Sequence, residues 1–264
     1  MQHALIAFSP NTAISGRTAK TLVAMQAIGA IVFWFIWSWS SPIIPNPLEI
    51  WQAFGKLWFQ EGLGHELITS YVVNLKALGY SLILSLGLSY LTVVPAIRPL
   101  AGFVSKLRFL GLAGLTFIFT LTIGGGENLK IALLTFGMSV FFLTSMAAEV
   151  ASIPGEKFDH ARTLRMGEWR VVWEVVILGK LDSAIEVMRQ NAAIGWTMLT
   201  MVEGIVRSEG GVGALLLTQN KHFHLSEVFA IQIMILLVGI LQDYGIGLMK
   251  NKICPYADLN LERR

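Results

Sequence analysis

Long uncharged apolar runs recur along this chain, and they limit what it can fold into. A helix needs about 20 mostly apolar residues to cross roughly 30 Å of hydrocarbon. Six runs reach or approach this length: 21–41, 77–97, 109–123, 131–148, 190–202 and 228–242. Because 54% of the residues are hydrophobic and only 14% are charged, we predict an all-α fold, a polytopic membrane helical bundle of about six transmembrane helices.

The positions of the basic residues predict which side of the membrane each loop faces. Cytoplasmic loops carry an excess of Lys and Arg. With a cytoplasmic N-terminus, the basic residues that remain on the outer side are Lys56, Lys130, Arg207 and Lys221. Nearly all the others then lie inside. Both termini are therefore predicted to be cytoplasmic, in a multi-pass protein of the cell (inner or plasma) membrane.

This sidedness divides the chain into three parts. A cytoplasmic segment, 1–20, precedes a transmembrane domain, 21–250, whose longest cytoplasmic loop is 151–189, and a cytoplasmic tail, 251–264, follows. The first span is predicted to be retained, since it is long and rich in aromatic residues and lacks a small-residue cleavage site. The net charge of +3 is interpreted as a topology signal, so no nucleic-acid partner is predicted.

Outside the membrane, a proline-rich segment from residue 41 to residue 46 is followed by a helical pattern. Ile50, Phe54, Leu57 and Trp58 recur at helical spacing. Two interpretations remain open for this helix. It lies flat on the outer membrane surface, or it packs over the end of the bundle.

The central loop contains a charged, amphipathic segment, 158–178. The pattern predicts a short helix from Phe158 to Gly167, with Ala161 and Leu164 on one side. A second short helix is predicted to begin at Glu168. On the residues alone, such a loop is either a solvated surface or a docking surface.

A series of motifs resembles the inner-membrane permease subunits of ATP-binding-cassette (ABC) importers, and above all their nitrate, sulfonate, taurine and bicarbonate group. The loop motif of these permeases begins Glu-Ala-Ala, and it aligns with Asp159, His160 and Ala161. Further matches, in the order and on the sides expected, are 45–50, Gly79, Gly87, 124–127, Arg189, Trp196, Glu203, 211–213, 239–243 and 255–256.

The chain also departs from the pattern of these permeases. In an ungapped register, the glycine of the loop motif becomes Arg165, and its Leu-Pro pair becomes Ile177 and Leu178. The resemblance is therefore to a divergent member, and it leaves open whether two copies or two different permease subunits pair.

The resemblance implies the fold of a type I ABC importer permease and a dependence on other subunits. The sequence has no Gly-rich loop followed by Lys-Ser or Lys-Thr that could hold ATP phosphates. The implied partners are separate ABC ATPase subunits, an extracytoplasmic solute-binding protein, a second permease subunit and membrane lipid. The residues implied to couple to the ATPase are Phe158, Asp159, His160, Ala161, Arg162, Thr163, Leu164, Arg165, Met166 and Gly167. Of these, Ala161 and Leu164 are expected to pack into a groove of the ATPase, with Asp159, Arg162 and Arg165 at its rim.

Polar residues within the predicted spans are candidates for the wall of a solute path, because polar groups in hydrocarbon are costly unless paired or hydrated. The predicted lining residues are Asn74, Lys76, Asn191, Thr197, Thr200 and Glu203. Two of them have alternative roles. Lys76 could extend toward the membrane interface, and Glu203 could form a helix-end hydrogen bond. The expected solute is small and anionic.

No catalytic residue, metal site or cofactor is predicted, and the chain is not expected to be an enzyme. His65 precedes Glu66, but position 69 is Thr, so the His-Glu-x-x-His zinc motif is absent. Two other function classes remain as alternatives, a secondary transporter and a membrane scaffold protein, both acting without an ATPase. A secondary transporter is expected to show repeated halves, which this sequence lacks.

Overall fold

The computed structural model describes residues 16–40 and 44–255 of the 264-residue chain. Within these ranges every regular element is helical. Most of the predicted N-terminal segment, Ser41 at the end of the first predicted span and residues 256–264 of the predicted tail lie outside the described residues. The elements are α2 (Gly16–Ser40), α3 (Pro47–Phe59), α4 (Leu63–Leu91), α5 (Arg98–Lys106), η1 (Leu107–Phe109), α6 (Leu112–Ile123), α7 (Glu127–Ala151), α8 (Gly155–Thr163), α9 (Glu168–Val171), η2 (Val172–Ile177), η3 (Leu178–Lys180), α10 (Leu181–Ile205), η4 (Arg207–Glu209), α11 (Val212–Lys221) and α12 (Leu225–Ile253).

The predicted fold class, an all-α membrane bundle, is confirmed, but the helices that could cross a membrane differ in number from the prediction. Among the described residues, four are long and apolar enough: α2, α4, α7 and α12. A fifth span is counted only if 98–109 and α6 are taken together as one broken span, although the chain bends by 111° between them. By length and composition, the structure therefore supports four or five spans, against the six predicted.

Two of the predicted spans account for this difference. The predicted third span, 109–123, is the 12-residue helix α6, which is about 18 Å long at 1.5 Å per residue and too short to cross alone. The predicted fifth span, 190–202, lies within α10, a helix of 25 residues. Its length is sufficient, but Arg189, Gln190 and Asn191 lower its mean hydropathy.

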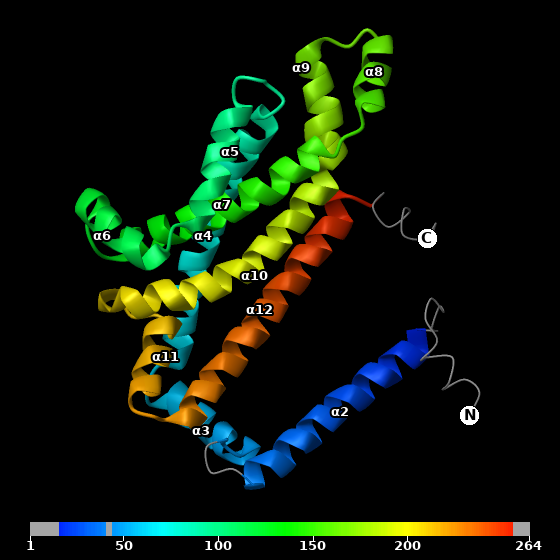
Figure 1. The fold of residues 1–264 in the computed structure, drawn as a ribbon. Coiled ribbons are helices and arrows are strands. Elements are labelled where there is room, and N and C mark those ends of the chain that lie inside the picture. Colours follow the sequence, from blue (N-terminus) through cyan, green and yellow to red (C-terminus); the bar gives the residue numbers. More distant parts are fainter. Residues whose placement is uncertain (1–15, 41–43, 256–264) are drawn as a thin grey trace.

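The centre of the bundle is formed by α4, α7 and α10, which cross one another in Figure 1. Their shared core contains Val73 and Ala77 of α4, Leu133 of α7 and Leu199 of α10. Gly195 of α10 permits the close approach: a Cβ atom there would lie 2.8 Å from Met138 Cε and 2.9 Å from Asn74 Oδ1. Small residues commonly allow membrane helices to pack in this way.

The outer helix α3 packs over the end of the bundle. A capping box at Asn46 and Glu49 starts it, and its face with Ile50 and Leu57 is buried against α4 and α12. Lys56 Nζ lies 3.0 Å from Glu227 Oε1 of α12. Of the two interpretations left open by the sequence, these contacts favour packing over the bundle, although Trp51 on the opposite face is exposed.

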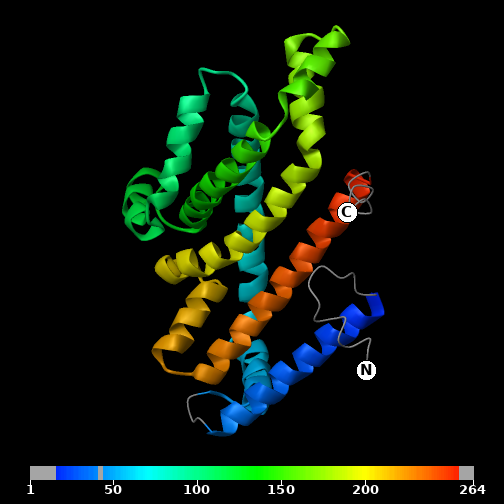
Figure 2. The same cartoon turned by 45° about the vertical axis from the view of Figure 1, so that its right-hand side comes forward.

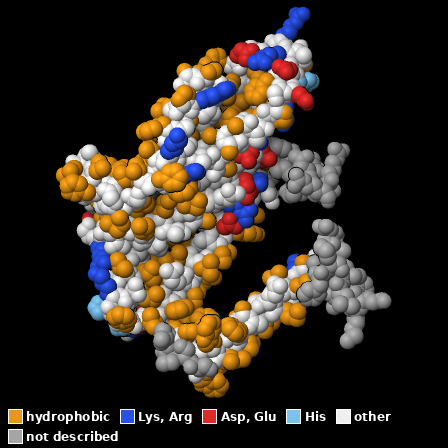
Figure 3. Space-filling model, viewed as in Figure 1, with side chains coloured by type: hydrophobic (Ala, Val, Ile, Leu, Met, Phe, Trp, Pro, Cys, Tyr) orange, Lys and Arg blue, Asp and Glu red, His pale blue; other side chains and the backbone are white. Residues whose placement is uncertain are grey.

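Helix α2 diverges from the rest of the molecule in both ribbon views (Figures 1 and 2). It approaches the bundle near its C-terminal end, where the rings of Trp34 and Phe229 are 6.3 Å apart. Hydrophobic side chains cover it and much of the bundle surface in Figure 3. Such apolar surfaces are expected of a chain surrounded by lipid or by other membrane subunits.

The crossing of α11 over α10 generates a first prediction. A Cβ atom at Gly213 would lie 2.4 Å from Thr200 O and 2.7 Å from Thr200 Cα, whereas one at Gly79 in α4 would meet nothing within 4 Å. Gly213→Ala is expected to destabilise the fold by about 1–3 kcal/mol, because backbone atoms must move. Thermal unfolding in detergent should show a Tm lower by several degrees. Gly79→Ala, the matched control, should leave the Tm unchanged or raise it, and equal Tm values for the two variants would contradict the packing described.

Candidate functional site

A helical hairpin projects from one end of the bundle (Figure 1). Pro154 precedes its first arm, α8, and its second arm consists of α9, the π-helical segment η2 and η3, which continue into α10. The predicted coupling helix, 158–167, corresponds to α8 and the turn after it. The structure begins this helix three residues earlier, at Gly155, and ends it at Thr163.

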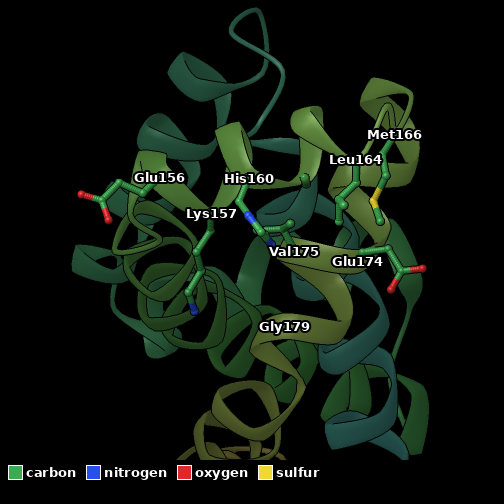
Figure 4. Close-up of a pocket in the computed structure, with 9 residues that line it drawn as sticks. Glu156, Lys157, His160, Leu164, Met166, Glu174, Val175 and Gly179 are labelled. Carbon is green, nitrogen blue, oxygen red and sulfur yellow. The ribbon is translucent and has the colours of Figure 1, made fainter.

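A groove of about 630 Å³ lies between the two arms of the hairpin (Figure 4). The first arm and its turn contribute charged and apolar side chains, and the second arm contributes the π-helical segment. The lining residues are Glu156, Lys157, His160, Ala161, Leu164, Met166, Glu174, Val175 and Gly179. π-Helical turns occur mostly as short insertions and often at functional sites.

Ala161 and Leu164, the two residues expected to pack into the ATPase, differ in exposure. The side chain of Ala161 is 4% exposed, because the second arm of the hairpin covers it. Ala161 lines the inner side of the hairpin groove, and its predicted packing against an ATPase stays a prediction. Leu164 is 58% exposed and Trp169 is 71% exposed, and Trp173 and Leu178 of the second arm are also exposed, so these side chains together form the accessible apolar surface of the hairpin.

Two of the three charged residues predicted at the rim, Asp159 and Arg162, are bonded within the hairpin. Arg162 Nε lies 3.0 Å from Glu168 Oε1, and Arg162 Nη1 lies 3.2 Å from Asp159 Oδ1. The hydrogen bond from Arg162, assisted by its charge, holds the pKa of Glu168 below its usual value. Arg162 thus links α8 to α9 across the turn between them.

Arg165 occupies the one position of this turn with a left-handed backbone. Its φ is 56°, and its N–H bonds to Arg162 O at 2.9 Å. This is the position at which the permeases that the chain resembles carry glycine, the residue that adopts positive φ without steric cost. Arg165 therefore adopts the same left-handed turn, although a positive φ is less favourable for arginine than for glycine.

The base of the hairpin is tied to α7. Lys180 Nζ lies 2.8 Å from Glu149 Oε2 and 3.0 Å from Ser152 Oγ. Val176 of η2 is fully buried in a cluster with Phe142 and Met146 of α7. A movement of the hairpin is therefore transmitted directly to α7 and α10.

The predicted path residues separate into two groups. Asn74, Asn191 and Glu203 are each no more than 1% exposed, so they face neighbouring helices of the same chain rather than open space. Thr197 is exposed and Thr200 is half-buried. For these three residues the solute path stays a prediction, and the structure shows only that they are buried between helices of this chain.

Glu203 instead forms hydrogen bonds at the corner between α10 and α11. It accepts from Ser70 Oγ at 2.7 Å and from the N–H of Gly213 at 2.9 Å. Lys130, which is also buried, donates to Gly210 O at 2.6 Å. These bonds fix α4, α7, α10 and α11 together, as the helix-end alternative for Glu203 anticipated.

Lys76 lies at the surface and pairs with Glu127. The Nζ–Oε1 distance is 2.6 Å, and both side chains are almost half exposed. This ion pair joins α4 to the N-terminal turn of α7, where an acidic residue is favourable.

Two pairs between α10 and α12 were missed by the sequence analysis. Arg189 binds Asp243 with two hydrogen bonds, at 2.5 and 2.6 Å, and Trp196 Nε1 donates to Gln242 Oε1 at 2.8 Å. These four residues lie within motifs that were recognised in the sequence. Their pairing was not visible because it depends on how the two helices face each other.

Arg165 generates a second prediction. Arg165→Gly is expected to stabilise the hairpin turn by about 1 kcal/mol, because it removes the steric cost of the left-handed backbone. Hydrogen exchange of the amides of 161–166 should slow. Gly167, at φ −67°, is the control: Gly167→Ala should produce no comparable slowing, and faster exchange in Arg165→Gly would contradict the prediction.

Comparison with known proteins finds ABC transporter proteins both by sequence and by structure. No protein-family model matches the chain. SsuC of Bacillus subtilis (strain 168), which bears the name of an aliphatic sulfonates transport permease protein, is 26% identical over 231 residues, covering 83% of this chain and 80% of SsuC. The protein MJ0413 of Methanocaldococcus jannaschii, named as an ABC transporter permease, is 26% identical over 158 residues, covering 59% of this chain and 54% of MJ0413.

Two solved structures have a similar fold. An amino acid ABC transporter crystallised with histidines matches with a TM-score of 0.57 at 12% identity, covering 75% of this chain and 95% of that one. The inward-facing methionine transporter MetNI matches with a TM-score of 0.52 at 14% identity, covering 76% and 97%. The similar proteins are transport subunits rather than enzymes. The chain is therefore a divergent match to ABC transporter permeases, similar to them in sequence and in its helical, multi-pass membrane fold.

Proposed function

We propose that this chain is the permease subunit of an ATP-driven importer for a small aliphatic oxyanion, and that its hairpin, 155–180, couples it to a separate ATPase. The observation that carries this proposal is the exposed apolar surface of the hairpin, Leu164 and Trp169, beside an open groove. Exposed apolar side chains surrounded by charges are typical of protein interfaces.

The distribution of charge supports a cytoplasmic position for the hairpin. Lys157, Arg165 and Arg170 lie on it, and Lys250 and Lys252 lie in the last turn of α12. Basic residues are retained on the cytoplasmic side of membrane proteins. ATP is present in the cytoplasm, so an ATPase partner would contact the hairpin on the cytoplasmic side of the membrane.

The internal bonds of the hairpin support its role as a rigid lever. Arg162 joins its two arms, and Lys180 ties its base to α7. When the nucleotide closes the ATPase, displacement of Leu164 would therefore move α7 and α10 as well. Such a lever shifts the balance between inward-facing and outward-facing packing.

The class of solute rests on the relative SsuC, whose name refers to aliphatic sulfonates. We propose an aliphatic sulfonate or a similar oxyanion, delivered by an extracytoplasmic solute-binding protein. A second permease subunit would complete the path. Thr197 and Thr200 of α10 remain candidates for its wall, because Thr197 is exposed and its carbonyl accepts from Thr200 Oγ1 at 2.9 Å.

Leu164 provides the third prediction. Leu164→Asp is expected to abolish both ATPase binding and ATP-driven uptake, because a charge would replace the apolar contact. Co-purification with the cognate ATPase and uptake into proteoliposomes would measure the two effects. Leu48→Asp is the matched control, since Leu48 is 65% exposed at the opposite end of the bundle, and it should retain ATPase binding.

Two results would contradict the proposal. If Leu164→Asp retained ATPase binding and uptake, the hairpin would not be the coupling element. If uptake proceeded without any ATPase, the chain would be a secondary transporter.

A further inference from the structure

A second pocket, of about 510 Å³, lies where α5 meets the end of α7 and the first arm of the hairpin. Arg98, Gly102 and Ser105 of α5 line it, together with Ala151 of α7 and Phe158 of α8. In both ribbon views, α5 and the hairpin lie at the same end of the bundle (Figures 1 and 2). Pockets of about 300–1,000 Å³ hold small molecules or head groups. We propose that this pocket binds the head group of an anionic phospholipid.

The first observation is an unbalanced positive charge beside the pocket. Arg98, Lys106 and Arg108 follow one another along α5 and η1, whereas the sequence has no Asp or Glu from Leu67 to Gly126. None of the three cations forms a salt bridge with another described residue. No acidic side chain lines the pocket either. A cluster of one sign of charge attracts a ligand of the opposite sign, so an anion is the expected occupant.

The second observation is a set of hydrogen-bond donors that the fold leaves available. Arg98 Nε donates to Thr92 O at 3.0 Å, which orients the guanidinium group. Its terminal nitrogens, Nη1 and Nη2, have no acceptor in the described part of the chain, and neither does the hydroxyl of Ser105. Two terminal guanidinium nitrogens match two oxygen atoms of a phosphate group, and a hydroxyl can donate to a third.

The side chains between the cations favour a lipid over a soluble anion. Leu100, Phe103 and Phe109 are largely exposed on the same segment, and the guanidinium carbon of Arg108 lies 5.1 Å from the ring centroid of Phe109. A soluble anion would neutralise the charges and leave these apolar side chains uncovered. A phospholipid satisfies both, with its phosphate group at Arg98 and its acyl chains beside Phe103. Basic pockets between membrane helices bind anionic head groups in this way.

The position of the pocket gives the lipid a structural role. An occupant bonded to Arg98 would also contact Ala151 and Phe158, because all three line the same pocket. It would therefore join α5 to the base of the hairpin. The inference rests on the membrane fold and does not require the proposed ATPase or solute, so either proposal can fail without the other.

Native mass spectrometry of the full-length chain, titrated in detergent with dioleoyl phosphatidylglycerol or dioleoyl phosphatidylcholine, tests the site. These lipids share their acyl chains and differ in net charge, and the first phosphatidylglycerol should bind about tenfold more tightly. Arg98→Gln should weaken phosphatidylglycerol binding about tenfold and leave phosphatidylcholine binding unchanged, because it removes charged donors. Arg207→Gln is the matched control and should keep the preference, since exposed Arg207 also donates from Nε to a backbone carbonyl, that of Gly204 at 3.1 Å.

Gly102→Leu fills the pocket and keeps every charge. A Cβ atom at Gly102 would meet nothing within 4 Å, so the fold should tolerate the change, and phosphatidylglycerol binding should weaken. Gly79→Leu, at an equally open position of α4 outside the pocket, should leave binding unchanged.

Four results would overturn the proposal. They are equal affinity for the two lipids, unchanged phosphatidylglycerol binding in Arg98→Gln or in Gly102→Leu, an equal loss of binding in Arg207→Gln, and displacement of phosphatidylglycerol by excess inorganic phosphate. The last result would assign the pocket to a soluble anion.

Discussion

The close packing of α4, α7 and α10 is the constraint on which the rest of this structure depends. Inside a membrane, lipid chains are as apolar as leucine, so helices are held together by shape and by buried polar contacts rather than by exclusion of water. Gly195 allows the close approach, since a Cβ atom there would lie 2.8 Å from Met138 Cε and 2.9 Å from Asn74 Oδ1. Glu203 supplies the polar contact, with bonds to Ser70 and Gly213.

This core explains how a small hairpin can act on the whole bundle. α7 and α10 leave the core side by side, and the hairpin is inserted between them in the sequence. Lys180 and Val176 hold its base against α7. Because packed helices move as units and not as separate residues, a force on Leu164 is expected to reach α7 and α10.

The sequence predicted the helical membrane fold, the hairpin and the relationship to permeases. These rest on local patterns, which apolar length, charge and motif order reveal directly. The sequence could not show which neighbour each residue faces. Ala161 and Leu164 share a helix side in the sequence, yet the second arm of the hairpin covers only Ala161. Asn74 and Asn191 are polar residues in apolar helices, and the sequence cannot distinguish a residue that lines a path from one that packs between helices.

Arg165 shows both what the sequence could reveal about the hairpin turn and what required the structure. The alignment located the position where related loops carry glycine, but only the backbone, at φ 56°, gives the reason. Polar residues lower the mean hydropathy of α10, and Arg189 is one of them. The same residues give this helix a polar face.

The central claim is that the tip of the hairpin touches an ATPase, and a photo-crosslinking amino acid placed at position 164 in intact membranes tests it most directly. The account predicts a crosslinked product that contains the ATPase subunit and whose yield changes when ATP is trapped. A product with lipid alone, or with a protein on the outer side of the membrane, would contradict it.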